Sequence, residues 1–201
     1  CFAALSLGLL QDNSPEVFEC LERRLDGREG NPDVPVCALL AIGLIGDKSK
    51  VADLTGWLDE GRIGRNKLND LERAYVATAL GKIGDPAALK PLESTLRKKG
   101  TLTRRSSMIA LGQILPQADA DTQHDYVKKI AAVLRNESDT TALNFGIIAL
   151  GRIAGQNDAS EQVRKTAVGV LLDQFKNGGK STERPYAALA LGLVCFEASS
   201  D

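Results

Sequence analysis

The sequence predicts an all-α fold, an α-α superhelix (right-handed α-solenoid) of about five to six two-helix repeats. Three observations predict it: an Ala/Leu-rich run with a glycine recurs six times, each run has helical spacing, and the intervening segments are amphipathic. The composition agrees, because 43% of the 201 residues are hydrophobic and only 4% are aromatic. This apolar content excludes a disordered chain, and small apolar side chains favour closely packed helices.

The recurring run is the strongest signal in the chain. In its third copy, Val76, Ala79, Leu80 and Ile83 follow the i, i+3, i+4, i+7 spacing of one helix face. A glycine inside a helix lowers its stability by about 1 kcal/mol relative to alanine. Six glycines in the same phase therefore predict that neighbouring helices approach each other closely at that position. The shared glycines are Gly8, Gly43, Gly81, Gly112, Gly151 and Gly192.

The ends of two runs predict where helices stop and start. Gly46 and Gly84 follow the second and third runs, and glycine ends helices in a left-handed conformation. Asp47 and Asp85 come next, and a short polar side chain there predicts the beginning of the following helix.

Amphipathic first helices are expected between the runs. The first of them, Pro15–Leu25, has Ser14 as its expected N-cap and Pro15 in its first turn. No segment alternates between apolar and polar residues, so no β-sheet is expected. The apolar stripes of the later first helices are Val51, Leu54 and Leu58; Leu89, Leu92 and Leu96; Val127, Ile130, Ala131 and Leu134; and Val163, Ala167, Val170, Leu171 and Leu172.

These runs resemble the HEAT repeat family, in particular the short repeats named for phycobilin-lyase-like proteins. That family has an arginine near the start of the second helix and Ala-Leu-Gly-x-Ile at its end. Arg73, Arg104 and Arg184 each lie seven residues before the Leu of a Leu-Gly pair and match the family arginine. The resemblance covers essentially the whole chain and implies a single HEAT-like solenoid over residues 1–201. We expect the chain to be a fragment of a longer one.

Two departures from the family pattern concern this arginine. The second repeat has Pro35 and the fifth Leu143 at its position. The family's pairing aspartate, six residues before the arginine, is replaced by Lys67, Lys98 and Gly178. The Asp–Arg ladder between repeats that the resemblance implies is therefore placed in doubt.

Three connections are longer than a compact helix pair needs: Asp26–Asp33, Glu60–Lys67 and Lys176–Glu183. In a solenoid, such connections lie on one edge. They are either contact surfaces or insertions tolerated in solvated loops.

The residues for chemistry are sparse. The chain has one histidine, His124, for which a solvated or capping role is expected, and no His-Glu pair of the kind that holds iron in deoxyhypusine-hydroxylating HEAT-like enzymes. Glycine-rich phosphate loops and nucleophile-elbow motifs are absent from the sequence. The four cysteines are expected to be small buried thiols. The sequence thus predicts no catalytic, metal-binding or cofactor-binding residues.

The charge is nearly balanced, with 25 Lys and Arg against 26 Asp and Glu. This balance disfavours a dedicated nucleic-acid binder. A local basic stretch at residues 97–105 contains Arg97, Lys98, Lys99, Arg104 and Arg105. It either meets an acidic partner or combines cations at a helix C-terminus with the family arginine.

The functional prediction is a non-catalytic protein–protein interaction or scaffold module without membrane insertion. Its second helices, those that end in Leu-Gly, are expected to line the concave side, and exposed positions near their starts are expected to contact a protein partner. A bilin lyase or isomerase, implied only by the named subfamily, is the alternative, and a helical-repeat nucleic-acid binder is less favoured. The predicted partner-binding residues are Arg73, Arg104, Arg105, Asn144, Arg184 and Tyr186.

Overall fold

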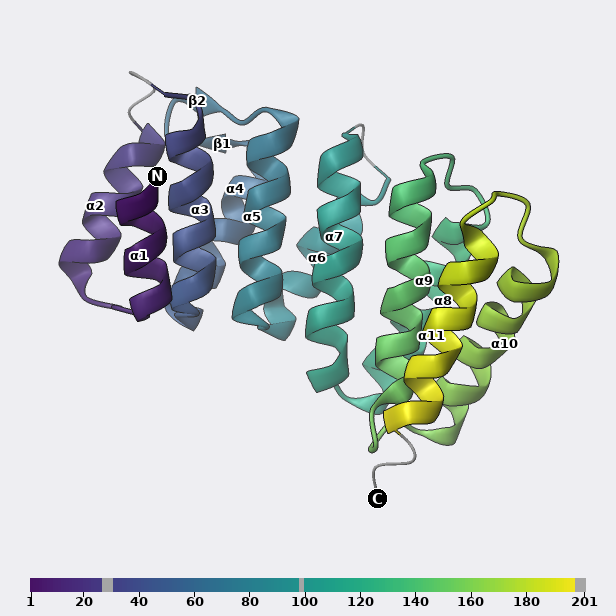
Figure 1. Cartoon of the computed structure of the whole chain (residues 1–201). Coiled ribbons are helices and arrows are strands. Elements are labelled where there is room, and N and C mark those ends of the chain that lie inside the picture. The colour runs from purple at the N-terminus through teal and green to yellow at the C-terminus, as the bar shows by residue number, and fades with distance from the viewer. Residues whose placement is uncertain (27–30, 98–99, 198–201) are drawn as a thin grey trace. The chain divides into compact units, whose positions relative to one another are not determined.

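The structure is a computed structural model that describes residues 1–26, 31–97 and 100–197. The chain divides into two compact units, Cys1–Ala110 and Leu111–Asp201, and each is described by itself. Within each unit, successive second helices pack side by side in one layer, with the first helices in a second layer behind (Figure 1). The prediction of an all-α solenoid of two-helix repeats is confirmed.

Unit 1 contains an isolated second helix followed by repeats of a first and a second helix. The second helices α1, α3 and α5 contact one another in sequence, and the first helices α2 and α4 each pack on the second helix of their repeat. The elements are α1 (Phe2–Leu10), α2 (Pro15–Asp26), α3 (Asp33–Ile45), η1 (Lys48–Lys50), α4 (Val51–Glu60), β1 (Arg62–Ile63), β2 (Asn66–Lys67), α5 (Asp70–Ile83), η2 (Pro86–Ala88), α6 (Leu89–Thr95) and α7 (Thr101–Ile114), whose last turn belongs to unit 2.

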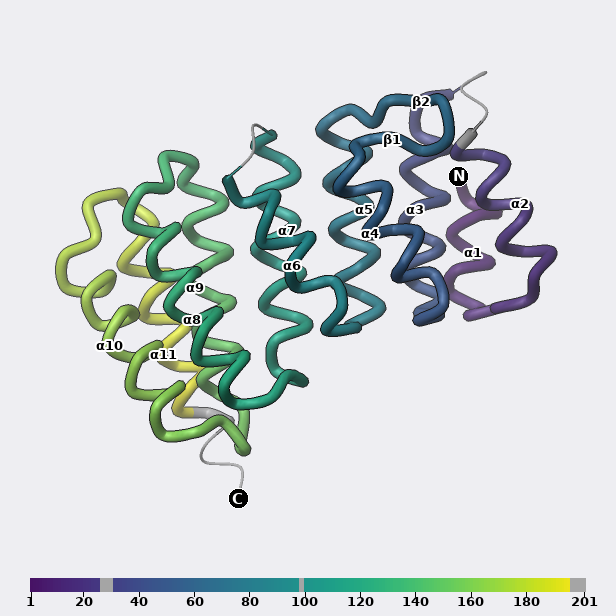
Figure 2. Tube along the Cα trace, turned by 180° about the vertical axis from the view of Figure 1, so that it is seen from behind, coloured from purple at the N-terminus to yellow at the C-terminus, as the bar shows by residue number. Residues whose placement is uncertain are grey.

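Unit 2 continues the same alternation. The second helices α9 and α11 pack together, and the first helices α8 and α10 contact each other behind them, as the rear view in Figure 2 shows. Its elements after the end of α7 are η3 (Leu115–Gln117), α8 (Ala120–Leu134), α9 (Thr140–Gly155), α10 (Glu161–Asn177) and α11 (Glu183–Glu197).

The predicted helix boundaries between α3 and α4 and between α5 and α6 are confirmed. Gly46 and Gly84 are left-handed, with φ values of 78° and 76°, and end α3 and α5. The Asp47 side chain accepts a hydrogen bond from the Ser49 backbone N–H, and Asp85 caps the next first helix in the same way. Each Gly-Asp pair therefore ends one helix and begins the next.

The connection from α4 to α5 departs from the expectation of no β-structure. It forms a two-stranded antiparallel hairpin in which Arg62 pairs with Lys67 and Ile63 with Asn66. Gly61 and Gly64 have positive φ values of 67° and 53°, which allow the chain to turn at both places. The pairs are too few to produce the alternation by which strands are recognised in a sequence.

The first-helix stripes form the core as predicted, except at two residues of α10, the half-buried Val170 and the exposed Leu172. Val163, Ala167 and Leu171 are buried at four-residue spacing, whereas Leu172 is 39% exposed because it lies a further 100° around α10. The expectation of buried thiols is wrong for Cys1, Cys20 and Cys195, which are exposed, because position and not residue type decides burial.

Four of the six shared glycines contact the next second helix in the same register. A Cβ added at Gly43 would lie 2.6 Å from the Ala79 Cα, a distance that Cβ atoms do not adopt. Each contacted alanine lies two residues before the next shared glycine. The predicted close approach is therefore confirmed at Gly8 with Ala41, Gly43 with Ala79, Gly112 with Ala149 and Gly151 with Ala190. We call this arrangement the Gly–Ala register.

Candidate partner-binding surface

Within each unit, the second helices leave one face uncovered by the first helices. This face carries the positions six and three residues before each shared glycine, which are exposed or half-buried throughout. Most of the side chains there are apolar, although they lie on the solvent side of the layer. They are Phe2 and Leu5, Cys37 and Leu40, Tyr75 and Thr78, Ser106 and Ile109, Phe145 and Ile148, and Tyr186 and Leu189.

In unit 1, α5 and α7 add exposed aliphatic side chains to this face. Leu71, Leu102 and Ile109 have exposed fractions of 43%, 38% and 39%. Leu71 and Leu102 occupy equivalent positions, ten residues before their glycines, and Tyr75 and Arg105 lie one turn further along. We call these five residues the unit 1 patch.

Unit 2 presents the corresponding positions on α9 and α11. Phe145 and Ile148 are half-buried on α9, and Tyr186 is half-buried on α11. Leu189 is 58% exposed one turn after Tyr186. The predicted contact residue Tyr186 is therefore half-buried, with the more exposed Leu189 beside it.

The predicted arginines Arg73 and Arg184 are engaged in their own connections. The Arg73 guanidinium donates to the Leu68 carbonyl oxygen from Nε at 3.3 Å and from Nη2 at 3.4 Å. The Arg184 Nε donates to the Gly178 carbonyl oxygen at 3.3 Å. The accepting carbonyl lies five residues before Arg73 and six residues before Arg184. In both cases it is at the end of the connection where the family has its aspartate.

Hydrogen bonds to Asp70, and not to an aspartate at the family position, join α5 to α7. The Asp70 carboxylate accepts from the backbone N–H groups of Leu102 and Thr103 at 3.0 and 3.1 Å and from the Thr103 hydroxyl at 2.7 Å. Gly100, which precedes α7, has φ 143°, and a Cβ there would lie 2.6 Å from Asp70 Oδ1. Asp70 therefore caps the helix of the next repeat from outside.

Two opposing effects set the pKa of Asp70. Partial burial acts to raise the pKa of the carboxyl group, but the hydrogen bonds from Thr103 and Leu102 and the positive charge of Arg73 act in the other direction. The pKa of Asp70 is lowered as a result, so the group is a carboxylate at neutral pH.

Asn144 also joins neighbouring repeats. Its Nδ2 donates to the Thr182 hydroxyl at 2.9 Å, and only 6% of the residue is exposed. The Lys180 ammonium donates to the carbonyl oxygens of Glu137 and Ser138, both at 3.0 Å. These contacts bind the connection before α11 to the one before α9.

The structure brings together only some of the predicted binding residues. Arg105 shares a helix face with Leu102 and Ile109, whereas Arg104 lies one position earlier, at the register of Arg73. Of the basic stretch, Arg97 is exposed, and Lys98 and Lys99 lie outside the described residues. A role in partner binding stays a prediction for all six residues.

Sequence reasoning missed the apolar members of the unit 1 patch. Leu71, Leu102 and Ile109 were not among the predicted contact residues, because leucine and isoleucine usually lie in the core. A helical wheel aligned on the shared glycine could have found them, since they lie on the face opposite the buried stripe.

Across residues 1–26, 31–97 and 100–197, no group of three or more His, Cys, Asp or Glu side chains is arranged to hold a metal ion. No helix within those ranges is long and apolar enough to cross a membrane.

Comparison with known proteins identifies the repeat. Residues 72–98, which include most of α5 and α6, match the family model of the PBS lyase HEAT-like repeat. No curated protein matches the chain.

Two solved structures resemble the chain. Computationally designed armadillo repeat proteins for modular peptide recognition have 14% identity and a TM-score of 0.54, over 95% of this chain and 91% of theirs. Human deoxyhypusine hydroxylase in complex with glycerol has 20% identity and a TM-score of 0.48, over 96% of this chain and 78% of its own. The first likeness concerns the fold alone. Residues 72–98 therefore match a PBS lyase HEAT-like repeat, and the fold of the chain is an all-α solenoid of two-helix repeats like that of the armadillo repeat proteins.

Proposed function

We propose that this protein is a non-catalytic interaction module that binds a partner protein through the exposed face of its second helices. The single observation that carries the proposal is the unit 1 patch, where three large aliphatic side chains are more than one-third exposed on neighbouring helices. Contiguous exposed apolar residues on a water-soluble surface mark interaction sites.

The composition of the patch supports a protein ligand. Tyr75 and Arg105 accompany the aliphatic residues, and aromatic and arginine side chains are enriched at protein interfaces. The Gly–Ala register supports the proposal as well, because it fixes the helices that carry these side chains. A preorganised surface loses less conformational entropy when it binds.

Site-specific cross-linking tests the proposal. A photo-reactive amino acid at position 71 or 109 should capture a partner from native lysate, and the same probe at the exposed Lys90 of α6 should not. With the purified partner, Ile109→Glu should weaken the Kd at least tenfold because it places a charge in an apolar contact. The matched control Lys90→Glu should leave the Kd unchanged. Equal capture at position 90, or an unchanged Kd for Ile109→Glu, would count against the second-helix face.

A further inference from the structure

We infer that unit 2 contains a second binding site, a groove between the first helices α8 and α10 that takes an extended acidic peptide of a partner protein. This inference goes beyond the proposed function, because the groove lies in the layer of first helices and not on the second-helix face. It has a volume of about 380 Å³ and includes Ala131 and Arg135 of α8 and Lys165, Thr166, Gly169 and Asp173 of α10.

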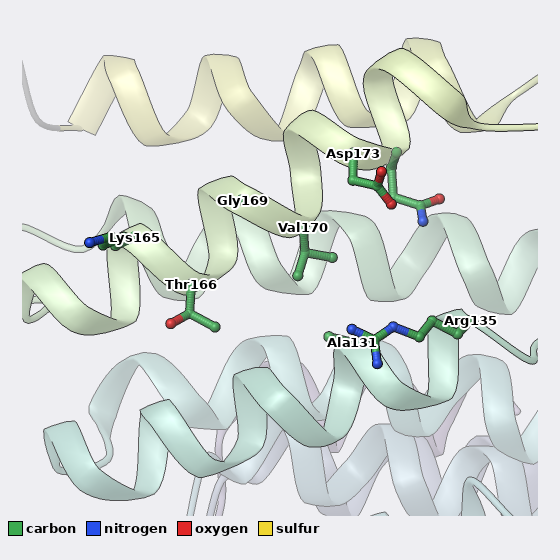
Figure 3. A pocket seen from close by; sticks show the side chains of 8 residues that line it. Ala131, Arg135, Lys165, Thr166, Gly169, Val170 and Asp173 are labelled. Atoms are coloured by element: carbon green, nitrogen blue, oxygen red, sulfur yellow. The ribbon is translucent and has the colours of Figure 1, made fainter.

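The floor of the groove is open because a helical glycine lies in it. Gly169 is in the middle of α10, is exposed, and has no atom within 4 Å of where its Cβ would lie. No neighbouring helix therefore requires a glycine at this position, although glycine makes the helix less stable than alanine would. The missing side chain leaves room beside Ala131, and Figure 3 shows Thr166 and Val170 pointing from α10 toward α8 next to this space.

Unpaired cations line the groove. Within the described part of the chain, no ion pair or side-chain hydrogen bond engages Arg135 or Lys165, and both are exposed. Figure 3 shows the Arg135 side chain running back along the groove toward Ala131. Lys128, also exposed, lies on the same face of α8 one turn before Ala131. Asp173 is the acid among the lining residues, so the groove carries a net positive charge.

The dimensions fit a short extended peptide. At one end, His124 Nε2 lies 3.4 Å from the Thr166 hydroxyl, so the two helices meet there. The lining residues of α10 extend from Lys165 to Gln174, a rise of about 14 Å, which is the length of about four residues of extended chain. Acidic side chains near both ends of such a segment would reach Lys165 and Arg135, while small residues between them would lie over Gly169.

The polar groups beside Arg135 support a peptide backbone as the ligand. Asp173 and Gln174 lie on the α10 side of that end, and together they offer carboxylate and amide groups for hydrogen bonds. A peptide backbone supplies both N–H donors and carbonyl acceptors to such a pair, whereas a phosphodiester group has acceptors only. A peptide therefore fits this mixed environment better than a nucleic acid does.

Fluorescence anisotropy tests the inference with a fluorescein-labelled nonapeptide that has glutamate at positions 3 and 7 and alanine elsewhere. The unmodified protein should bind it saturably with a Kd below about 1 mM. The double variant Arg135→Glu, Lys165→Glu should weaken binding at least tenfold. The control Lys48→Glu, Lys90→Glu changes the net charge equally at exposed positions of unit 1 and should stay within twofold.

A second pair of variants tests the role of the open floor. Gly169→Leu should reduce affinity at least tenfold because the side chain fills the groove, while Gly56→Leu, at another open glycine, should not change it. Circular dichroism at 222 nm should show both variants folded. No saturable binding below 1 mM, equal losses in both charge-reversal variants, or tighter binding of a labelled single-stranded DNA would overturn the inference. None of these results would affect the second-helix proposal.

Discussion

Two glycines in unit 1 occupy the middle of helices and have opposite surroundings. Gly43 of α3 is in backbone contact with α5, and an added Cβ would lie 2.6 Å from the Ala79 Cα. Gly56 of α4 has no atom within 4 Å of the same position. The helices α3 and α5 therefore approach so closely that only glycine fits at position 43, whereas α4 has free space around Gly56.

This difference shows that glycine content alone does not report packing. In the second helices, glycine permits contact between backbones and so fixes the spacing of the repeats. In the first helices, it weakens the helix without a packing gain, and at Gly169 it opens a groove. Substitutions at the two kinds of position should therefore change stability in opposite directions.

The largest effect is expected for Gly43→Ala. The added methyl group cannot fit against α5 unless the helices separate, and overpacking of this kind costs about 1–3 kcal/mol. Urea denaturation followed by circular dichroism at 222 nm should show a lower free energy of unfolding than for the unmodified protein. Equal or greater stability would show that α3 and α5 are not held at this distance.

A smaller loss of stability is expected for Asp70→Ala, because this substitution leaves the N–H groups of Leu102 and Thr103 in α7 without their acceptor. Loss of a capping side chain typically costs about 0.5–2 kcal/mol. The control Asp53→Ala removes an acid from the first turn of α4 that has no such contact to a following helix, and it should cost less. Urea midpoints for the two variants provide the test, and equal midpoints would argue against a cap from the preceding repeat.

The effect of Asp70→Ala should also depend on pH. The folded-state pKa of Asp70 is lowered relative to the ordinary value of about 3.9. The stabilisation by the carboxylate is therefore complete above about pH 4 and is lost as the pH falls through the folded-state pKa. The difference in free energy of unfolding between the two proteins should be constant from pH 7 to pH 5 and should shrink toward pH 3. A difference that grows toward pH 3 would contradict this sign.

An effect of similar or smaller size is expected for Arg73→Ala, which removes the donors to the Leu68 carbonyl oxygen. A hydrogen bond of this type contributes about 0.5–1.5 kcal/mol. The hairpin before α5 should exchange its amide hydrogens faster in this variant, because Leu68 anchors the hairpin through its backbone N–H to Gly61. Hydrogen exchange followed by mass spectrometry checks this, and unchanged protection of residues 61–68 would remove the framework role of Arg73.

The smallest expected change in the free energy of unfolding is an increase, for Gly56→Ala. Alanine favours the helix by about 1 kcal/mol at most, and the open space accepts its methyl group without strain. The urea midpoint should rise slightly. A fall in the midpoint would mean that the space beside α4 is occupied in solution.

The fold could be predicted from the sequence because its signals are local and repeated. The shared glycines, the Gly-Asp boundaries and the four-residue stripe of α10 each depend on neighbours along one helix. The hairpin at Gly61 and Gly64 was missed because two residue pairs produce no periodicity. Leu172 was misplaced because adjacent apolar residues do not show which of them faces the core.

The candidate surfaces were harder to predict because they depend on contacts between distant residues. The sequence offered Arg73 and Asn144 as exposed contacts, but Arg73 bonds to Leu68 and Asn144 to Thr182. Asp70 gave no signal, because its partners lie 32 and 33 residues away. Tyr186 was predicted as an exposed contact residue and is half-buried, six residues before Gly192 on the same helix.

One paired measurement tests the Gly–Ala register most directly. Gly151 and Gly192 occupy the same register position in α9 and α11, but a Cβ at Gly151 would lie 2.8 Å from the Ala190 carbonyl oxygen and one at Gly192 would meet no atom within 4 Å. Urea denaturation of Gly151→Ala and Gly192→Ala compares identical substitutions in equivalent sequence motifs. The register predicts a loss of about 1–3 kcal/mol for Gly151→Ala and no loss for Gly192→Ala. Equal effects of the two substitutions would contradict it.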